Sequence, residues 1–226
     1  MRYQYMLLDF DGTILDSALL ERQALTLLFD QMGHTLTDEM VDYYHNLNIR
    51  YWAKFEAGEI SMQQLRQGRF EEMFADFGIR DCDPADMNAA FITHSGTLGP
   101  MHEGTLEVLE ALHDQCCMCM VTNGFTGTQY GKIAASGVGP FFDHIFIAEE
   151  MGARKPGRAF FQQVHDKLGN PPPEEMLMIG DSLMADILGG VNFGIDTCWM
   201  NPEGAPNETT VTPTYEIRRL GELLTF

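Results

Sequence analysis

Basic residues are scarce in this sequence. Of its 226 residues, 14 are lysine or arginine and 33 are aspartate or glutamate, which gives a formal net charge of -19. This charge would repel a nucleic acid rather than attract it through counterion release, so we expect no nucleic-acid partner. It gives no attraction to a phosphorylated small molecule either. An anionic ligand would therefore need a locally held cation, and a divalent metal on clustered carboxylates would serve.

Long apolar runs are also missing. No apolar stretch approaches the roughly 20 residues that span a membrane, and the apolar run near the N-terminus meets Asp9 and Asp11 too early for a signal-peptide core. We therefore expect a soluble, cytoplasmic protein with no membrane partner. Hydrophobic residues make up 45% of the chain, enough for one sizeable core or for one core with a smaller inserted module.

Cysteines are few and odd in number. There are five, and Cys116, Cys117 and Cys119 lie in one apolar stretch that is typical of a buried strand. We expect reduced thiols in a core rather than disulfides. A metal site built on Cys117 and Cys119 would need further Cys or His ligands at zinc spacing, and none occur nearby in the sequence.

The region from about Ser17 to Phe91 is predicted to be almost wholly helical. One apolar face is expected from the spacing of Leu19, Leu20, Ala24, Leu27 and Leu28. Ser61 is expected to cap a further helix that carries Leu65, Phe70, Phe74 and Phe77.

After His102 the pattern changes to strands that alternate with helices. Strands are expected at residues 4–9, 117–122, 144–150, 175–181 and 196–200. This alternation predicts an α/β core with a doubly wound, Rossmann-like parallel sheet, which binds its ligand beyond the carboxyl ends of the strands. The core would comprise residues 1–16 and 97–226. The helical block, residues 17–96, would be an inserted domain placed as a lid.

The first strand ends in two carboxylates. Asp9 and Asp11 are separated by Phe10, and side chains two apart on a strand point to the same face if the strand persists. Two like charges that close raise each other's pKa unless a cation lies between them. The alternative is a plain boundary between strand and loop with two solvated aspartates.

Two further segments place polar groups where an anion could bind. Thr122 and Asn123 end a strand before a glycine, which frees a hydroxyl and backbone N–H groups, although Thr-Asn-Gly is also an ordinary turn. Lys155 precedes Pro156 at the expected start of a helix, where a lone lysine is usually a solvated surface charge.

A third strand end carries more carboxylates. Gly180 and Asp181 end the strand, and Asp186 lies about one turn into the helix that is expected to follow. Metal binding is one interpretation of these aspartates. Helix capping is the alternative.

Taken together, four motifs resemble those of the haloacid dehalogenase superfamily of phosphotransferases. They are DFDGT from residue 9, TN from residue 122, RKP from residue 154 and GDSLMAD from residue 180. They occur in the order of that family, and the resemblance covers nearly the whole chain. It implies a Rossmann-like core with a helical cap inserted after the first motif.

The resemblance also implies roles for individual residues. Asp9 would be the nucleophile and Asp11 the general acid and base. Thr122, Asn123 and Lys155 would bind the phosphoryl group of the substrate. Mg²⁺ would be held by Asp9, Asp181 and the backbone carbonyl of Asp11, with Gly180 and Asp186 in support.

Other functions of the same superfamily stay open. A dehalogenase would lack the second aspartate, so Asp11 argues against that branch. A phosphoglycolate or sugar-phosphate phosphatase and a phosphosugar mutase share both aspartates. A signalling receiver also phosphorylates an aspartate beside Mg²⁺, but receivers are about half this length and have no inserted helices.

Three segments, residues 48–61, 65–74 and 122–138, are similar to the branch of pyrimidine 5′-nucleotidases. This similarity predicts nucleoside 5′-monophosphates as substrates, with pyrimidine forms preferred. Side chains able to stack on a base or bind its edge are Tyr44, Tyr51, Trp52, Phe125, Asn46, Asn48 and Gln129. Aromatic residues at helical spacing are also typical of plain core packing.

Overall fold

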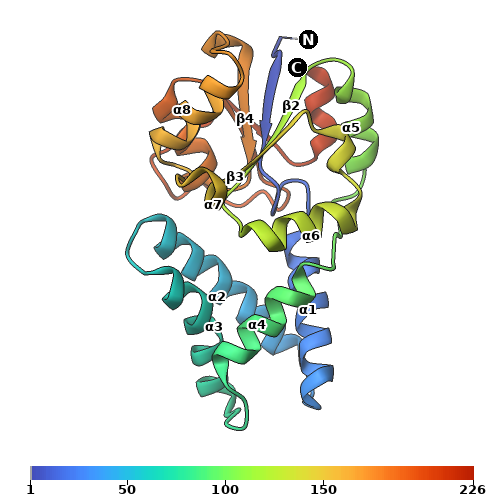
Figure 1. Cartoon of the computed structure of the whole chain (residues 1–226), viewed down its shortest axis with the longest axis vertical. Helices are drawn as coiled ribbons and strands as arrows, with labels where there is room; N and C mark the ends of the chain where they lie inside the picture. Colours follow the sequence, from blue (N-terminus) through green and yellow to red (C-terminus); the bar gives the residue numbers. More distant parts are fainter. Residues whose placement is uncertain (1) are drawn as a thin grey trace.

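The computed structural model describes residues 2–226. It has a parallel sheet flanked by helices at one end and a bundle of helices at the other (Figure 1). The chain begins and ends at the sheet end, far from the bundle (Figure 1).

The sheet has six strands. They are β1 (Tyr5–Leu8), β2 (Cys117–Thr122), β3 (His144–Ile147), β4 (Met176–Gly180), β5 (Asp196–Met200) and β6 (Tyr215–Ile217). Their order is β3-β2-β1-β4-β5-β6, and every neighbouring pair is parallel. The predicted α/β fold class is therefore confirmed. Because β1 lies between β2 and β4, the chain reverses its winding at β1, where ligands bind in such sheets.

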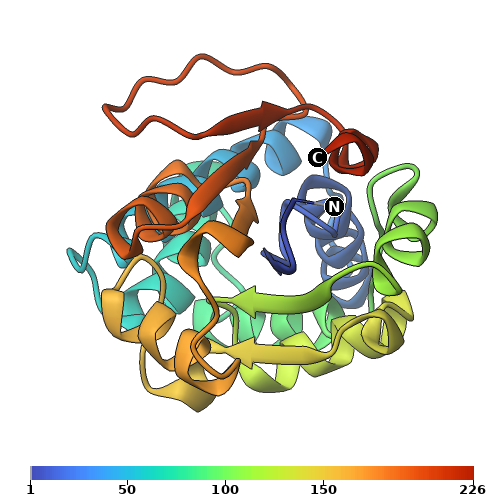
Figure 2. The same ribbon diagram turned by 90° about the horizontal axis from the view of Figure 1, so that it is seen from above.

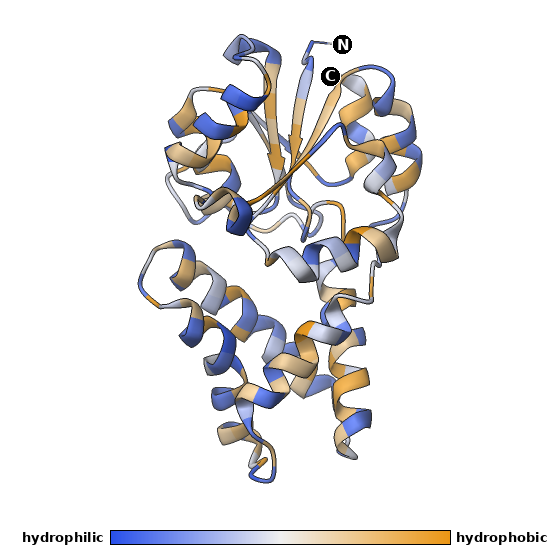
Figure 3. Ribbon diagram, in the orientation of Figure 1, coloured by the Kyte–Doolittle hydropathy of each residue, from blue (hydrophilic) through white to orange (hydrophobic). Residues whose placement is uncertain are grey.

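Helices cover both faces of the sheet, as Figure 2 shows from above. Met6 and Leu8 of β1 join a cluster with α5 (Thr105–His113), α6 (Thr126–Ser136) and the terminal 3₁₀ segment η4 (Leu220–Thr225). Leu7 points the other way, into a cluster with α7 (Ala148–Met151), α8 (Arg158–Lys167) and Phe193 of α9 (Leu188–Phe193). The strands are accordingly apolar on both faces. Figure 3 colours much of their length as hydrophobic.

Four helices form the bundle. They are α1 (Ser17–Met32), α2 (Asp38–Glu56), α3 (Met62–Phe77) and α4 (Pro84–Ser95). They enclose a hydrophobic cluster of their own. A separate cluster supports the expected inserted domain at residues 17–96, whose boundaries stay a prediction. The expected cap at Ser61 is confirmed, because its hydroxyl accepts from the backbone N–H of Gln64.

The predicted apolar face of α1 is partly wrong. Leu20, Ala24 and Leu28 are buried, but Leu19 and Leu27 are 40% and 41% exposed. The buried face of α1 consists of two adjacent rows at four-residue spacing, Leu20, Ala24 and Leu28 in one row and Glu21, Leu25 and Phe29 in the other. Leu19 and Leu27 come one residue before members of the first row, on the side away from the second, which turns them about 100° toward solvent.

Three other expected elements differ in their bounds. β1 ends at Leu8, one residue before the first aspartate. The expected strand at residues 144–150 ends at Ile147, and the short helix α7 follows directly. A π-helical turn, η3 (Leu183–Ile187), precedes α9, and short 3₁₀ segments occupy Gly139–Phe141 (η1) and Pro173–Glu175 (η2).

The two connections between the bundle and the sheet domain run side by side. The backbone N–H of Asp16 donates to the carbonyl of Pro100 at 3.0 Å, and that of His102 donates to Ile14 at 3.3 Å. Leu15 and Met101 form an antiparallel bridge between these hydrogen bonds. The bundle therefore joins the core through a short two-stranded ribbon.

Within residues 2–226, no helix is both long and apolar enough to cross a membrane. All five cysteines are free thiols, as the sequence predicts. Cys116, Cys119 and Cys198 are buried in the core, whereas Cys82 lies in a loop of the bundle.

Candidate active site

The carboxyl ends of three central strands bring the predicted motifs together. Asp9 follows β1, Thr122 ends β2 and Asp181 follows β4. These ends point toward the helical bundle (Figure 1). Because parallel strands present their carboxyl ends at one edge of a sheet, residues far apart in the sequence become neighbours there.

Lys155 lies at the centre of this group, and the surface-charge interpretation of it is wrong. Only 1% of the residue is exposed. Its Nζ donates to Asp9 Oδ1 at 2.5 Å, to Asp186 Oδ1 at 2.6 Å and to the carbonyl of Val121 at 2.8 Å. Burial opposes the charge of Lys155, but attraction to Asp186 and Asp9 outweighs this effect and raises its pKa. Lys155 is therefore a fixed cation beside Asp9.

Asp9 is buried, and the surroundings act on its charge in both directions. Burial raises the pKa of Asp9, Lys155 counteracts this effect, and Asp186 and Asp181 add to it. Oδ2 of Asp9 accepts no hydrogen bond from the described residues. Asp9 thus has one oxygen held by a cation and one oxygen free to react or to bind a metal.

Asp181 lies beside Asp9 at the entrance of the site. The indole N–H of Trp199 donates to its backbone carbonyl at 2.9 Å and fixes the loop. Asp181 keeps an exposed edge, yet the protein around it removes enough water to raise its pKa to about 7, with Asp186 adding to the effect. Gly12 has φ of 85°, and a Cβ there would lie 2.4 Å from Asp181 Oδ2. Glycine is therefore required for the close approach of these two loops.

These carboxylates match the ligands that Mg²⁺ prefers. Oxygens of Asp9, Asp181 and Asp186 lie within 4.8 Å of one another, and all three donors are hard carboxylates. Asp186 is already engaged, because Oδ1 accepts from Lys155 and Oδ2 accepts from the N–H of Ser182 at 3.0 Å. Asp9 and Asp181 are thus the residues suited to hold a metal, and Asp186 holds Lys155.

The close packing of Asp186 depends on the glycine that ends β4. A Cβ at Gly180 would lie 2.1 Å from Asp186 Oδ2. Gly180 thus leaves space for the Asp186 carboxylate, and Asp186 in turn holds the charge of Lys155 in position.

The condition under which Asp9 and Asp11 were expected to point to the same face is not met. The strand ends before both residues, so the alternation of strand side chains does not apply to them. Instead, Asp11 Oδ1 accepts from Lys132 Nζ at 2.7 Å, and Oδ2 accepts from Gln129 Nε2 at 2.8 Å. The same Gln129 nitrogen lies 2.6 Å from Thr122 Oγ1. Helix α6 therefore positions both Asp11 and Thr122.

Asn123 is committed to the loop that carries Lys155. Its Nδ2 donates to the carbonyl of Lys155 at 3.0 Å, and its Oδ1 accepts from the N–H of Lys155 at 2.9 Å. This pair of hydrogen bonds ties the end of β2 to the loop before α8. In this structure Asn123 fixes the position of Lys155.

The tip of the bundle reaches the site through the end of α2. Glu56 lies 3.5 Å from the hydroxyl of Ser182, and burial raises its pKa to about 7. The guanidinium of Arg154 lies 4.1 Å from the ring centre of Phe55 and donates to the carbonyl of Phe55 at 3.0 Å. The bundle therefore covers the site as a cap.

A second contact between cap and core is aromatic. Trp52 of α2 and Phe125 of the loop before α6 have ring centres 6.0 Å apart. The guanidinium of Arg66 in α3 lies 4.3 Å from the centre of the Phe125 ring, and its buried Nε has no hydrogen-bond partner among residues 2–226.

Several residues expected to contact a base are otherwise engaged. Tyr44 is fully buried in the cap core, and Gln129 is buried against Asp11. Asn48 donates to Glu21 at 2.5 Å, and Asn46 donates to the backbone of its own helix. The hydroxyl of Tyr51 donates to Glu72. These side chains pack or position their neighbours, which leaves Trp52 and Phe125 next to the site.

Comparison with known proteins agrees with this geometry. The chain is 37% identical to the HAD-hydrolase YfnB of Bacillus subtilis over 98% of this chain and 94% of that protein. It is 36% identical to the pyrimidine 5′-nucleotidase PynA of Streptococcus pneumoniae and 30% identical to the pyrimidine 5′-nucleotidase YjjG of Escherichia coli. Each of these two matches covers 99% of this chain, with 94% of PynA and 97% of YjjG.

Among solved structures, this chain is similar to a crystal form of YfnB bound to magnesium, with a TM-score of 0.94 over 100% of this chain and 98% of that one. That crystal form reveals interdomain movement in YfnB. The L-2-haloacid dehalogenase of Xanthobacter autotrophicus has a TM-score of 0.74 at 18% identity over 98% of this chain and 96% of that one, a likeness of fold. The model of haloacid dehalogenase-like hydrolases matches residues 3–194. The chain belongs to the haloacid dehalogenase-like hydrolases.

Proposed function

We propose that this chain is a Mg²⁺-dependent phosphatase that hydrolyses nucleoside 5′-monophosphates, with pyrimidine forms preferred, through a phosphorylated Asp9. The observation that carries the proposal is the buried Lys155, whose Nζ lies 2.5 Å from Asp9 and donates to the carbonyl of Val121, the residue before Thr122. A buried cation beside an aspartate with a free oxygen is suited to hold a phosphoryl group for attack.

The first half-reaction transfers the phosphoryl group to the protein. The free oxygen of Asp9 forms a bond to phosphorus while the ester bond to the leaving oxygen breaks. A protonated Asp11 gives its proton to that oxygen. Both oxygens of Asp11 accept hydrogen bonds from α6, so Asp11 must exchange one of these partners for the leaving group.

The second half-reaction returns Asp9 to its starting state. Asp11 takes a proton from water, the water oxygen bonds to phosphorus, and the bond between Asp9 and phosphorus breaks. The products are a nucleoside and inorganic phosphate. Lys155 would supply positive charge beside the phosphoryl oxygens in both steps, and because its three N–H groups already donate to Asp9, Asp186 and Val121, it would exchange one of these partners to donate to a phosphoryl oxygen. Thr122, oriented by Gln129, would donate its hydroxyl hydrogen to the same oxygens.

Asp9, Asp181 and the backbone carbonyl of Asp11 would hold Mg²⁺. The donor set is composed of oxygens, and the missing side chain at Gly12 leaves room beside Asp181. When bound, Mg²⁺ supplies positive charge that neutralises the nonbridging phosphoryl oxygens.

The contact between cap and core supports a flat, polar-edged leaving group. Trp52 and Phe125 form an aromatic pair on which a base could stack, and base stacking on an aromatic side chain contributes about 1–3 kcal/mol in proteins that bind single strands. The unpartnered Nε of Arg66 is buried beside Phe125, so it could donate to a carbonyl oxygen of a pyrimidine only after the cap moves away from the core. The names of PynA and YjjG support the pyrimidine preference.

The test compares kcat/KM for UMP, dTMP, AMP, glucose 6-phosphate and phosphoglycolate at one Mg²⁺ concentration. We expect UMP or dTMP to rank first, and activity to disappear in excess chelator. If phosphoglycolate or the hexose phosphate is at least tenfold better, about 1.4 kcal/mol of transition-state preference, the nucleotidase assignment is wrong. In that case the chain would still be assigned as a phosphatase, but one that acts on other substrates.

The nucleophile is tested separately. Asp9→Asn should abolish turnover of every substrate without loss of fold, because an amide oxygen is not a competent nucleophile. A freshly purified variant with near-native turnover, shown by mass spectrometry to be free of deamidation, would remove Asp9 from this role.

A further inference from the structure

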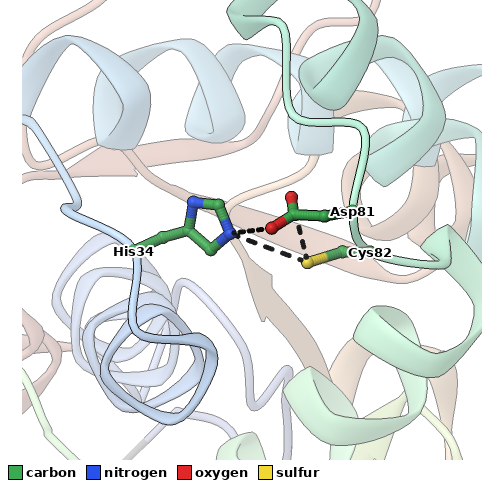
Figure 4. A group of neighbouring side chains, drawn as sticks. All are labelled: His34, Asp81 and Cys82. Carbon is green, nitrogen blue, oxygen red and sulfur yellow. Dashed lines mark hydrogen bonds and ion pairs between the residues drawn. The ribbon is translucent and has the colours of Figure 1, made fainter.

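A second group of potential metal ligands lies in the cap, in loops separate from the site described above. His34 belongs to the loop between α1 and α2, and Asp81 and Cys82 belong to the loop between α3 and α4. Figure 4 shows the three side chains pointing toward one another from the two loops. His34 Nε2 lies 3.2 Å from Asp81 Oδ2 and 3.9 Å from Cys82 Sγ, which is also 3.9 Å from Asp81 Oδ1.

We infer that His34, Asp81 and Cys82 bind a zinc-like divalent cation and thereby join the two loops. Nitrogen, oxygen and sulfur around tetrahedral zinc lie at about 2.0–2.3 Å from the metal, which separates nitrogen from oxygen by about 3.4 Å and sulfur from either by about 3.6 Å. His34 Nε2 lies 3.2 Å from Asp81 Oδ2 and 3.9 Å from Cys82 Sγ, within a few tenths of an ångström of these values. The 3.9 Å contact of Cys82 Sγ is with the other carboxylate oxygen, Oδ1 of Asp81, and one ligand atom from each of the three residues lies within 4.8 Å of the other two. A cation could enter with side-chain adjustments alone.

The chemistry of the three donors selects the metal. Imidazole and thiolate suit zinc and its first-row neighbours, whereas Mg²⁺ takes oxygen ligands. Thiolate and carboxylate together carry two negative charges, which balance a divalent cation. Three protein ligands leave a fourth position for water, the arrangement of open rather than closed zinc sites.

Binding requires that Cys82 lose its proton. Burial, and then the charge and hydrogen bond of Asp81, raise the pKa of the Cys82 thiol. The incoming cation must displace this proton, so its affinity should increase with pH. The resulting link would replace the exposed ion pair of His34 and Asp81, which on its own contributes little to stability.

The experiment uses the full chain saturated with Mg²⁺, so that the catalytic carboxylates are already occupied. One equivalent of Co²⁺ should produce a thiolate-to-cobalt charge-transfer absorption, which oxygen ligands cannot give. The absorption should be lost in Cys82→Ser. In His34→Gln the affinity for Co²⁺, measured from the same absorption, should fall at least about tenfold, since even indirect partners of a ligand affect affinity that much.

Two control variants separate this site from others. His94→Gln changes a cap histidine that contacts Gln31, and Cys117→Ser changes a thiol beside Cys119 in the core. Both should keep the absorption. Zn²⁺ should displace Co²⁺ and raise the unfolding temperature of the parent but not of Cys82→Ser. The inference is overturned if no absorption develops at pH 8, or if it persists in Cys82→Ser or is lost in Cys117→Ser.

Phosphatase activity provides an independent measure of folding in these variants. His34, Asp81 and Cys82 lie in the loops of the cap that do not contact Asp9 or Lys155, so the variants should turn over substrate like the parent. The outcome for the cation site thus does not depend on whether the proposed nucleotidase activity is correct.

Discussion

Replacing Lys155 with methionine should cost about 3–5 kcal/mol of unfolding free energy near neutral pH, in addition to its effect on catalysis. The size follows from burial, because Lys155 neutralises Asp9 and Asp186 in a position where neither carboxylate is well hydrated. Removing one partner from a buried ion pair leaves an uncompensated charge and costs this amount. It would be a large part of the roughly 5–15 kcal/mol that stabilises a typical domain.

Urea unfolding, followed by circular dichroism in chelating buffer, measures this loss. We expect a decrease of about 1 M or more in the urea midpoint for Lys155→Met. The control is Arg22→Met, which breaks an exposed ion pair with Asp38 and should cost at most about 1 kcal/mol. The double variant Lys155→Met with Asp186→Asn should be more stable than Lys155→Met alone, because one of the two uncompensated charges is gone.

The stability cost of Lys155→Met should depend on pH, and the direction of that dependence follows from the pKa of Asp9. Lys155 counteracts the rise in the pKa of Asp9 caused by burial, so its loss should raise that pKa further. When a carboxyl group has a higher pKa in the folded state than in the unfolded state, it costs no stability at pH values below its unfolded-state pKa. It destabilises the fold as the pH rises through its folded-state pKa. The cost of Lys155→Met should therefore grow from pH 4 to pH 8. A cost below about 1 kcal/mol that does not vary with pH would refute the buried-charge reasoning.

Two other predictions concern the cap. Arg154→Ala removes a hydrogen bond and a cation–π contact to Phe55, together about 1–2 kcal/mol, so hydrogen exchange at the end of α2 should accelerate roughly 5- to 30-fold, and unchanged exchange would contradict this role. The hydrogen bond of His45 to Glu21 raises the pKa of His45, so its stabilisation is present below about pH 6.5 and is lost as pH rises through the raised value. The unfolding temperature of the parent should exceed that of His45→Gln by at most a few degrees at pH 6, and the difference should shrink by pH 9; an equal difference at both pH values would argue against the ion pair.

Order and spacing of motifs were sufficient to bring the central residues together from the sequence. Asp9, Thr122 and Asp181 lie at or just beyond the ends of three neighbouring parallel strands, so the topology brings them to one edge of the sheet. Lys155 lies farther on, in the loop between α7 and α8, and its motif rather than a strand end indicated that it joins them. The boundaries of β2 and β5 needed no contact information either, because their apolar runs end where polar or turn residues begin.

The sequence did not reveal the residues that orient this group. Gln129 was expected to bind the edge of a base and Lys132 was given no role, and only the packing of α6 against the sheet turns both toward Asp11. Arg154 belongs to the RKP motif, but the motif does not predict its contact with Phe55 in the cap. Glu56 has no sequence signal beyond its place at the end of a helix, which many exposed residues share.

The paired connections between cap and core have a consequence for how such an enzyme can be rebuilt. The entering and leaving strands are already hydrogen-bonded to each other between Asp16 and Pro100, so a short turn could join them there without any displacement of the sheet. The same two backbone hydrogen bonds would close a minimal core of residues 1–16 and 100–226. In that shortened chain, selectivity among leaving groups would be separated physically from phosphoryl chemistry. Other caps could be grafted at the same pair of residues, so that one catalytic core could be combined with several caps of different substrate selectivity.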